Sequence, residues 1–210
     1  ISEIKFIGNK IFKNNKLRNI IVSEENRPWK FITSNKYLNE NRIKLDINLL
    51  KNYFKNKGYY NALIKSSSAK VVDSNNFVLT FNIDSGKKYY FNNINLEVSD
   101  NYKKENFSNF FEIFNELKGK AYSLKSIKKI INEIDKAALQ KEFVFINANY
   151  EEKIVNDNKI NVNIFFNESE KYYVDRINIF GNFITEEKVI RNTFIVDEGD
   201  PFNNILFNKS

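Results

Sequence analysis

The stretch FVLTFNID at Phe77–Asp84 is followed, after four residues, by YYFNNINL at Tyr89–Leu96. The same pattern returns as INVNIFFN at Ile160–Asn167, followed after four residues by YYVDRINI at Tyr172–Ile179. Both parts recur at a constant offset of 83 residues. Self-similarity at a fixed offset is the signature of tandem structural units, so the repeat indicates an array of similar domains.

The opening of the chain carries a third copy of part of this pattern. IKFIGN at Ile4–Asn9 matches INIFGN at Ile177–Asn182, and Ile94–Leu96 occupies the same place between them without the Gly-Asn pair. The first strand of each unit is therefore expected near these three positions, because each run alternates apolar and polar residues.

The repeat also sets the domain boundaries. We predict one unit over residues 1–86, a second over residues 87–169 and a truncated third over residues 170–210. The third holds a first strand, a first helix and the start of a second helix. A chain of 210 residues agrees with this division, since domains of about 100 to 150 residues are the most frequent.

The first unit has the sequence pattern of a strand, two helices and two further strands. Gly8 and Gly58 end the first strand and the second helix, and the last two strands are expected at Tyr59–Val72 and Phe77–Ile83. Residues at helical spacing mark the two helices: Leu17, Ile20 and Ile21 for the first, and Ile43, Ile47, Leu50 and Phe54 for the second.

The later units repeat this order. Ser123 is the expected N-cap of the second helix of the second unit, and Thr185 is the expected N-cap of the first helix of the third. If the first strand runs up, the first helix down and the second helix up, then the second strand runs down and the third runs up. The first and third strands can then lie side by side and parallel. The prediction is an α+β fold with tandem β-α-α-β-β units, each a three-stranded mixed sheet covered by two helices.

The second strand of the first unit is then left at the edge of its sheet. Lys and Ser are frequent along it, which suits an edge that faces water. An edge strand carries unpaired N–H and C=O groups that can pair with an extended peptide of almost any sequence. The predicted docking edge consists of Tyr60, Asn61, Ala62, Leu63, Ile64, Lys65 and Ser66.

Composition excludes most catalytic and metal-binding schemes. The chain has no Cys and no His, so thiolate and imidazole chemistry are absent. The acidic pairs Glu24-Glu25, Glu151-Glu152 and Glu186-Glu187 are interpreted as solvated surface or helix capping. We therefore expect no enzyme, no catalytic, cofactor or metal site, and no cofactor.

The net charge of +7 leaves one alternative open. A basic α+β domain that binds nucleic acid would have the same balance of charges, but it would need an aromatic platform or a basic stripe on one exposed face. Lys residues are instead spread along the chain among Asn, Asp and Glu, which indicates solvated surface. The expectation is that nucleic acid is not a partner.

The ends of the chain and its hydropathy give two further expectations. No stretch reaches the about 18 apolar residues that cross a bilayer. The chain opens without Met, and Asn203–Ser210 has the pattern of a helix that has just begun, so we expect a sequence cut at both ends. The lack of an export segment then carries no information on compartment.

The ordered motifs together resemble POTRA modules, the repeats that precede the membrane barrel in a family of outer-membrane proteins. The resemblance is carried by the Gly-Asn turns, by LLKNYF at Leu49–Phe54 with Lys57–Tyr59, and by YVDRINIFGN at Tyr173–Asn182. The long segment around Arg27–Asn39 is similar to the third of five modules, which makes the rest a fourth and the start of a fifth. The second unit departs from the pattern at Lys141–Phe143, where the first has Gly58-Tyr59.

What the resemblance implies is a periplasmic domain of an outer-membrane protein of a Gram-negative bacterium. Its expected role is that of a scaffold and chaperone in outer-membrane protein assembly. Its expected partners are unfolded outer-membrane proteins, accessory lipoproteins of the assembly complex and the chain's own C-terminal membrane barrel. Candidate partner contacts are Trp29, Phe180 and Asn182. Trp29 lies next to Pro28 in an expected loop, and packing of that loop over its own helices is the alternative role for it.

Overall fold

A computed structural model describes residues 1–8, 11–26, 39–73, 76–98, 104–140, 143, 146–156, 158–168 and 172–207. The chain divides into two compact units, which are described separately. The first takes in residues Ile1–Asn93, Glu116–Ile127 and Lys153–Asn161. The second takes in Ile94–Asn115, Lys128–Glu152 and Val162–Ser210. The domain boundaries drawn from the repeat stay a prediction.

The first sheet has three strands in the order β1-β3-β2, formed by β1 (Glu3–Ile7), β2 (Leu63–Asp73) and β3 (Asn76–Asp84). Strand β1 is parallel to β3, and β2 is antiparallel to β3. The alternating apolar residues of β1 and β3 share one face, as the register Ile4↔Leu79 shows. The predicted strand order is confirmed, and β2 lies at an edge.

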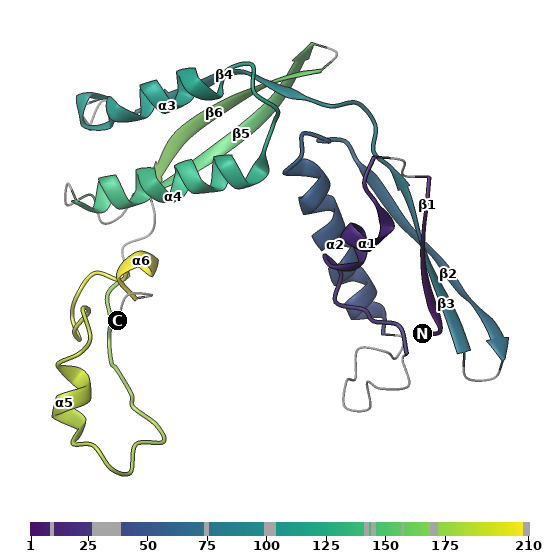
Figure 1. Cartoon of the computed structure of the whole chain (residues 1–210). Coiled ribbons are helices and arrows are strands. Elements are labelled where there is room, and N and C mark those ends of the chain that lie inside the picture. The colour runs from purple at the N-terminus through teal and green to yellow at the C-terminus, as the bar shows by residue number, and fades with distance from the viewer. Residues whose placement is uncertain are drawn as a thin grey trace. The chain divides into compact units, whose positions relative to one another are not determined.

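Helices α1 (Asn14–Arg18) and α2 (Glu40–Lys55) lie on one side of this sheet (Figure 1). The side chain of Asn39 caps α2 by accepting a hydrogen bond from the Arg42 N–H at 3.1 Å. Gly58, just past α2, has φ +95°, the left-handed conformation predicted for it. Helix and sheet side chains bury one core: Ile1, Ile4, Phe6, Leu17, Ile21, Leu50, Phe54, Ala62, Ile64, Leu79, Phe81 and Ile83.

Helix α1 is shorter than its apolar residues predict. It ends at Arg18, and Ile20 and Ile21 follow it, yet Ile21 is still buried in the core. The chain after α1 is held by Asp46 of α2, whose carboxylate accepts hydrogen bonds from the N–H groups of Val22 at 2.6 Å and Ser23 at 3.3 Å. Asp46 is fully buried, so this carboxylate replaces the helical turn that the pattern predicted.

The second sheet repeats the first, with order β4-β6-β5 for β4 (Tyr90–Glu97), β5 (Ile146–Asn156) and β6 (Lys159–Glu168). Between β4 and β5 the chain forms a 3-10 turn at Lys104–Phe107, then α3 (Asn109–Leu117) and α4 (Leu124–Gln140). The hydroxyl of Ser123 accepts a hydrogen bond from the Ser126 N–H at 3.2 Å, so the predicted cap of α4 is confirmed. The predicted α+β fold class is confirmed as well.

The third repeat contributes α5 (Glu187–Arg191) and α6 (Asn204–Phe207). The cap predicted at Thr185 is wrong, because Glu186 holds the N-cap position and makes no side-chain cap bond. The Asn182 side chain accepts a hydrogen bond from the Thr185 N–H at 3.0 Å, which closes a local turn and delays the helix.

No strand pairs with residues 174–180 within the described parts of the chain, although the first strand of the third repeat was predicted at Ile177 and Ile179. These residues instead border a hollow of about 910 Å³. Its lining includes Ile177, Val196 and Phe202, apolar side chains that a sheet would be expected to cover. Across the residues that the structure describes, no helix has the length and the apolar character to cross a membrane.

Candidate strand-docking edge

Strand β2 has β3 on one side only. Its backbone therefore presents every second residue's N–H and C=O groups away from the sheet. Four of the predicted docking residues lie in this strand, from Leu63 to Ser66, and pair with Asp84 to Phe81 of β3. Four of the seven predicted residues therefore lie on an edge strand.

The side chains along this edge alternate as a half-buried strand requires. Ile64 faces the core and is buried, whereas its neighbours Leu63, which is 56% exposed, and Lys65 face outward. The alternation ends at Ser66, which is exposed although it shares the face of Ile64. The register shifts between Ser67 and Lys70, where β2 holds one residue more than β3. Such a bulge twists an edge locally, so the regular part of the edge runs from Leu63 to Ser67.

Tyr60, Asn61 and Ala62 do not extend the edge, because β2 begins only at Leu63. The Tyr60 ring contacts the ring of Tyr122 edge-on at 5.0 Å, and the Nζ of Lys55 lies 4.6 Å from the Tyr60 ring centroid. Ala62 is buried. The strand was predicted to start at Tyr59, but these tertiary contacts override the β propensity of two tyrosines.

Tyr89 fixes the chain that leads into the edge. The Asn61 Nδ2 donates a hydrogen bond to the Tyr89 hydroxyl at 2.8 Å, and the Tyr89 N–H donates to the Gly58 carbonyl at 2.7 Å. The Asn56 side chain accepts a further hydrogen bond from the Lys125 N–H at 2.7 Å. Tyr60, Asn61 and Ala62 thus hold the chain just before β2 in place and do not belong to the strand.

The opposite edge of the sheet, β1, is occupied by side chains that sequence reasoning missed. The Ile4 N–H donates a hydrogen bond to the Glu25 carboxylate at 3.0 Å, and the Arg18 Nη2 donates to the Ile4 carbonyl at 3.0 Å. Arg18 and Glu25 also form an ion pair at 2.9 Å. Glu25 was assigned to solvated surface or capping; its side chain is only 17% exposed, and it caps a strand residue.

The remaining predicted contacts lie elsewhere. Trp29 lies outside the described residues. Phe180 is 89% exposed in the second compact unit, and its neighbours Phe183 and Ile184, which were not among the predicted contacts, are exposed as well. The apolar residues that follow the Gly-Asn turn were the available signal. Asn182 is engaged in the turn with Thr185.

The described residues contain no cluster of carboxylates that could hold a metal ion. Burial raises the pKa of the Asp135 carboxyl, and the Ala148 N–H that it binds at 2.6 Å acts in the opposite direction. This carboxylate joins α4 to β5, so its environment is explained by packing. The β2 edge offers main-chain hydrogen-bonding groups and a few exposed side chains, which are the groups that strand addition uses.

Comparison with known proteins agrees with this architecture. The POTRA family model, described as surface antigen variable number repeat, matches residues 1–86. Outer membrane protein assembly factor BamA of Neorickettsia risticii (strain Illinois) is 22% identical over 200 residues, which are 95% of this chain and 27% of that protein. The BamA of Buchnera aphidicola subsp. Acyrthosiphon pisum (strain APS) is 24% identical over 98% of this chain and 33% of that protein.

Among solved structures, POTRA3-5 of Haemophilus influenzae BamA covers the whole chain and 82% of its own length, at a TM-score of 0.72 and 14% identity. Residues 1–86 thus match the POTRA family, and the whole chain has the fold of tandem POTRA modules. The predicted module numbers, three to five, agree with this match.

A BamA from Haemophilus ducreyi that lacks POTRA domains 1–3 shows the same fold over 80% of the chain, at a TM-score of 0.56 and 14% identity. The chain spans a third or less of the length of the curated relatives named here. The solved structures therefore establish the fold of the modules.

Proposed function

We propose that these modules are a scaffold and chaperone part of the outer-membrane β-barrel assembly machinery, and that they receive unfolded barrel proteins by strand addition at β2. The proposal is supported by the edge position of β2 in a sheet whose opposite edge is occupied. The relatives' name, outer membrane protein assembly factor, indicates the process.

The edge suits clients that share little sequence. Main-chain pairing demands an extended backbone and makes few demands on side chains, and strands of membrane barrels alternate apolar and polar residues. A client strand beside β2 would place one set of its side chains next to Leu63 and Lys65 on the outer face. Binding is expected to be weak and sequence-tolerant, since about five regular residues offer the pairing.

Several parts of the proposal rest on the family alone. They are the periplasmic location in a Gram-negative bacterium, the docking of accessory lipoproteins and the attachment to a membrane barrel. The partner contacts at Trp29, Phe180 and Asn182 stay a prediction. The absence of catalysis is part of the same proposal, as POTRA modules are a scaffold family. The division at residues 86 and 169 is supported at its first boundary by the family match to residues 1–86.

Adjacent proline substitutions test the edge. N–H groups of successive strand residues point to opposite sides, so of Lys65→Pro and Ser66→Pro one removes an outward donor and the other removes a donor to β3. The outward variant should keep the parent's circular dichroism and lose binding of a fluorescent barrel-precursor peptide by about tenfold or more. The inward variant should destabilise the sheet.

Equal peptide affinity in the parent and in both folded proline variants would refute docking at β2. A parallel titration with DNA and RNA at two salt concentrations checks the expectation that nucleic acid is not a partner. Strong, salt-dependent binding in that titration would favour the basic-domain alternative.

A further inference from the structure

The first half of β1 is covered along the side that faces away from β3. Ile4 is central to this cover, because both its N–H and its C=O bind charged side chains, Glu25 and Arg18 respectively. The next residue after Glu25 continues it, since the Asn26 N–H donates a hydrogen bond to the Ile1 carbonyl at 2.8 Å. The Arg18 and Glu25 side chains are themselves paired and mostly buried, at 34% and 17% exposure.

The same arrangement recurs in the third repeat at an offset of 173 residues. The Arg191 Nη2 donates a hydrogen bond to the Ile177 carbonyl at 2.8 Å, and the Ile177 N–H donates to the Glu198 carboxylate at 3.0 Å. Arg191 and Glu198 are paired at 3.0 Å. Ile4, Arg18 and Glu25 thus have counterparts in the same order and with the same bonds, so the arrangement is a feature of the repeat.

An Arg-Glu pair bound in this way occupies the hydrogen-bonding positions of a neighbouring strand. One acceptor takes the N–H that an incoming strand would need, and one donor takes the C=O. A strand that entered here would have to break two charge-assisted hydrogen bonds, which are about twice as strong as neutral ones. It would also separate a partly buried ion pair, whose members would then lack partners.

We propose that the Arg18–Glu25 pair closes the β1 edge to strand addition and so directs client strands to β2. This inference rests on the proposed function for its client. The pair thus determines which of the two edges of the sheet, β1 or β2, accepts a strand.

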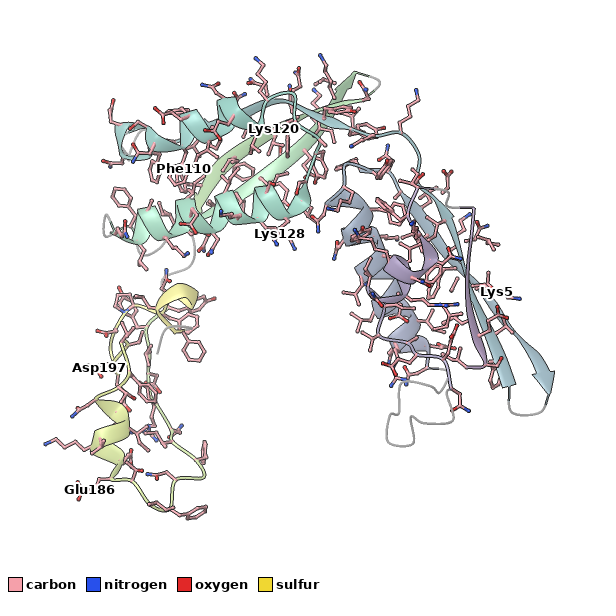
Figure 2. The ribbon with its side chains drawn as sticks, in the orientation of Figure 1. Lys5, Phe110, Lys120, Lys128, Glu186 and Asp197 are labelled. Atoms are coloured by element: carbon pink, nitrogen blue, oxygen red, sulfur yellow. The ribbon has the colours of Figure 1, made fainter. Side chains whose placement is uncertain are left out.

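Two exposed lysines provide matched positions for detection. Lys5 follows Ile4 in β1 and points away from the helices (Figure 2), and Lys65 follows Ile64 in β2 on the exposed face. A photoreactive p-benzoylphenylalanine at either position, in the full chain, will capture a barrel-precursor peptide that adds to that edge. In the parent background we expect capture at position 65 and not at position 5.

The double variant Arg18→Met and Glu25→Met keeps long side chains but removes the donor and the acceptor. It should raise capture at position 5 by about tenfold or more, because the loss of one charge-assisted hydrogen bond already changes an equilibrium constant by about tenfold. The control is Arg191→Met with Glu198→Met, the same change on Ile177, which should leave capture at position 5 at the parent level. Slow amide exchange at Leu79 and Phe81 verifies that the sheet remains folded.

If the double variant does not fold, Arg18→Met alone removes the donor to the Ile4 carbonyl and is expected to act in the same direction. Capture at position 5 in the parent refutes the inference, and so does a folded open variant without capture there. Capture at position 5 only after the pair is removed supports the inference even if position 65 is silent, in which case docking at β2 fails alone. Silence at both positions in every variant overturns both proposals.

Discussion

Gly8 and Gly181 occupy the same place in two repeats, and alanine substitutions at the two positions should have very different costs. Both glycines are left-handed, with φ +79° and +77°. A Cβ on Gly8 would lie 2.5 Å from the Ile83 carbonyl oxygen and 2.9 Å from the Asn82 Oδ1. A Cβ on Gly181 would meet nothing within 4 Å. The pair therefore separates backbone strain from crowding.

The shared contribution is the left-handed conformation, which costs about 1 to 2 kcal/mol for alanine. The crowding at Gly8 involves the backbone of β3, so β1 and β3 must move apart, and forced packing of this kind costs about 1 to 3 kcal/mol more. We expect Gly8→Ala to lower the free energy of unfolding by about 2 to 5 kcal/mol. Gly181→Ala should cost no more than about 2 kcal/mol.

Urea denaturation of the full chain, followed by the amide resonances of Leu79 and Phe81 for the first sheet and of Val189 for the third repeat, measures both effects. With a slope of about 2 kcal/mol per molar urea, Gly8→Ala should move the midpoint of the first sheet down by about 1 M or more. Equal shifts for the two variants would refute the reasoning, because strain alone would then account for both. An unchanged slope is needed for the comparison.

Three further predictions concern carboxylates. Asp46→Ala should destabilise the first unit by about 3 kcal/mol in chemical denaturation, because it leaves the N–H groups of Val22 and Ser23 without their acceptor. Asp46→Asn keeps an acceptor oxygen and should therefore cost less. Burial raises the pKa of Asp135 above its ordinary value of 3.8, so ionisation of this carboxyl destabilises the fold as pH rises through the raised pKa. Asp135→Asn should remove this pH dependence and be at least as stable at pH 7. Hydrogen bonds from the Ile177 N–H and Arg191 lower the pKa of Glu198. The ionised carboxylate therefore stabilises the fold above pH 4.5, and this stabilisation is lost as pH falls through the lowered pKa. The chemical shift of the Ile177 amide should report that loss, and a flat titration would contradict it.

Alternation and repeat order were sufficient for most of the fold. Ile4 and Phe6 alternate in β1, Leu79 and Phe81 alternate in β3, and the helix pair between them requires the parallel pairing that the structure shows. The edge position of β2 follows from that order. These features are local periodicities joined by one chain-direction argument, which is why they were accessible from sequence.

The features that the sequence analysis missed depend on contacts between distant residues. The start of β2 is delayed because Tyr60 packs on Tyr122, and helix α1 ends early because Asp46 binds the chain after it. The Arg18–Glu25 pair also joins residues that no helical or strand period connects. A search for equal spacings could have found it, since Ile, Arg and Glu recur together at an offset of 173 residues.

Nuclear magnetic resonance of the isotope-labelled full chain, titrated with an extended barrel-precursor peptide, tests the central claim most directly. Strand addition at β2 predicts shift changes and slower amide exchange at alternate residues from Leu63 to Ser67, with Ile4 and Phe6 of β1 unchanged. Changes confined to β1 or to the exposed residues Phe180 to Ile184, with β2 unaffected, would contradict it.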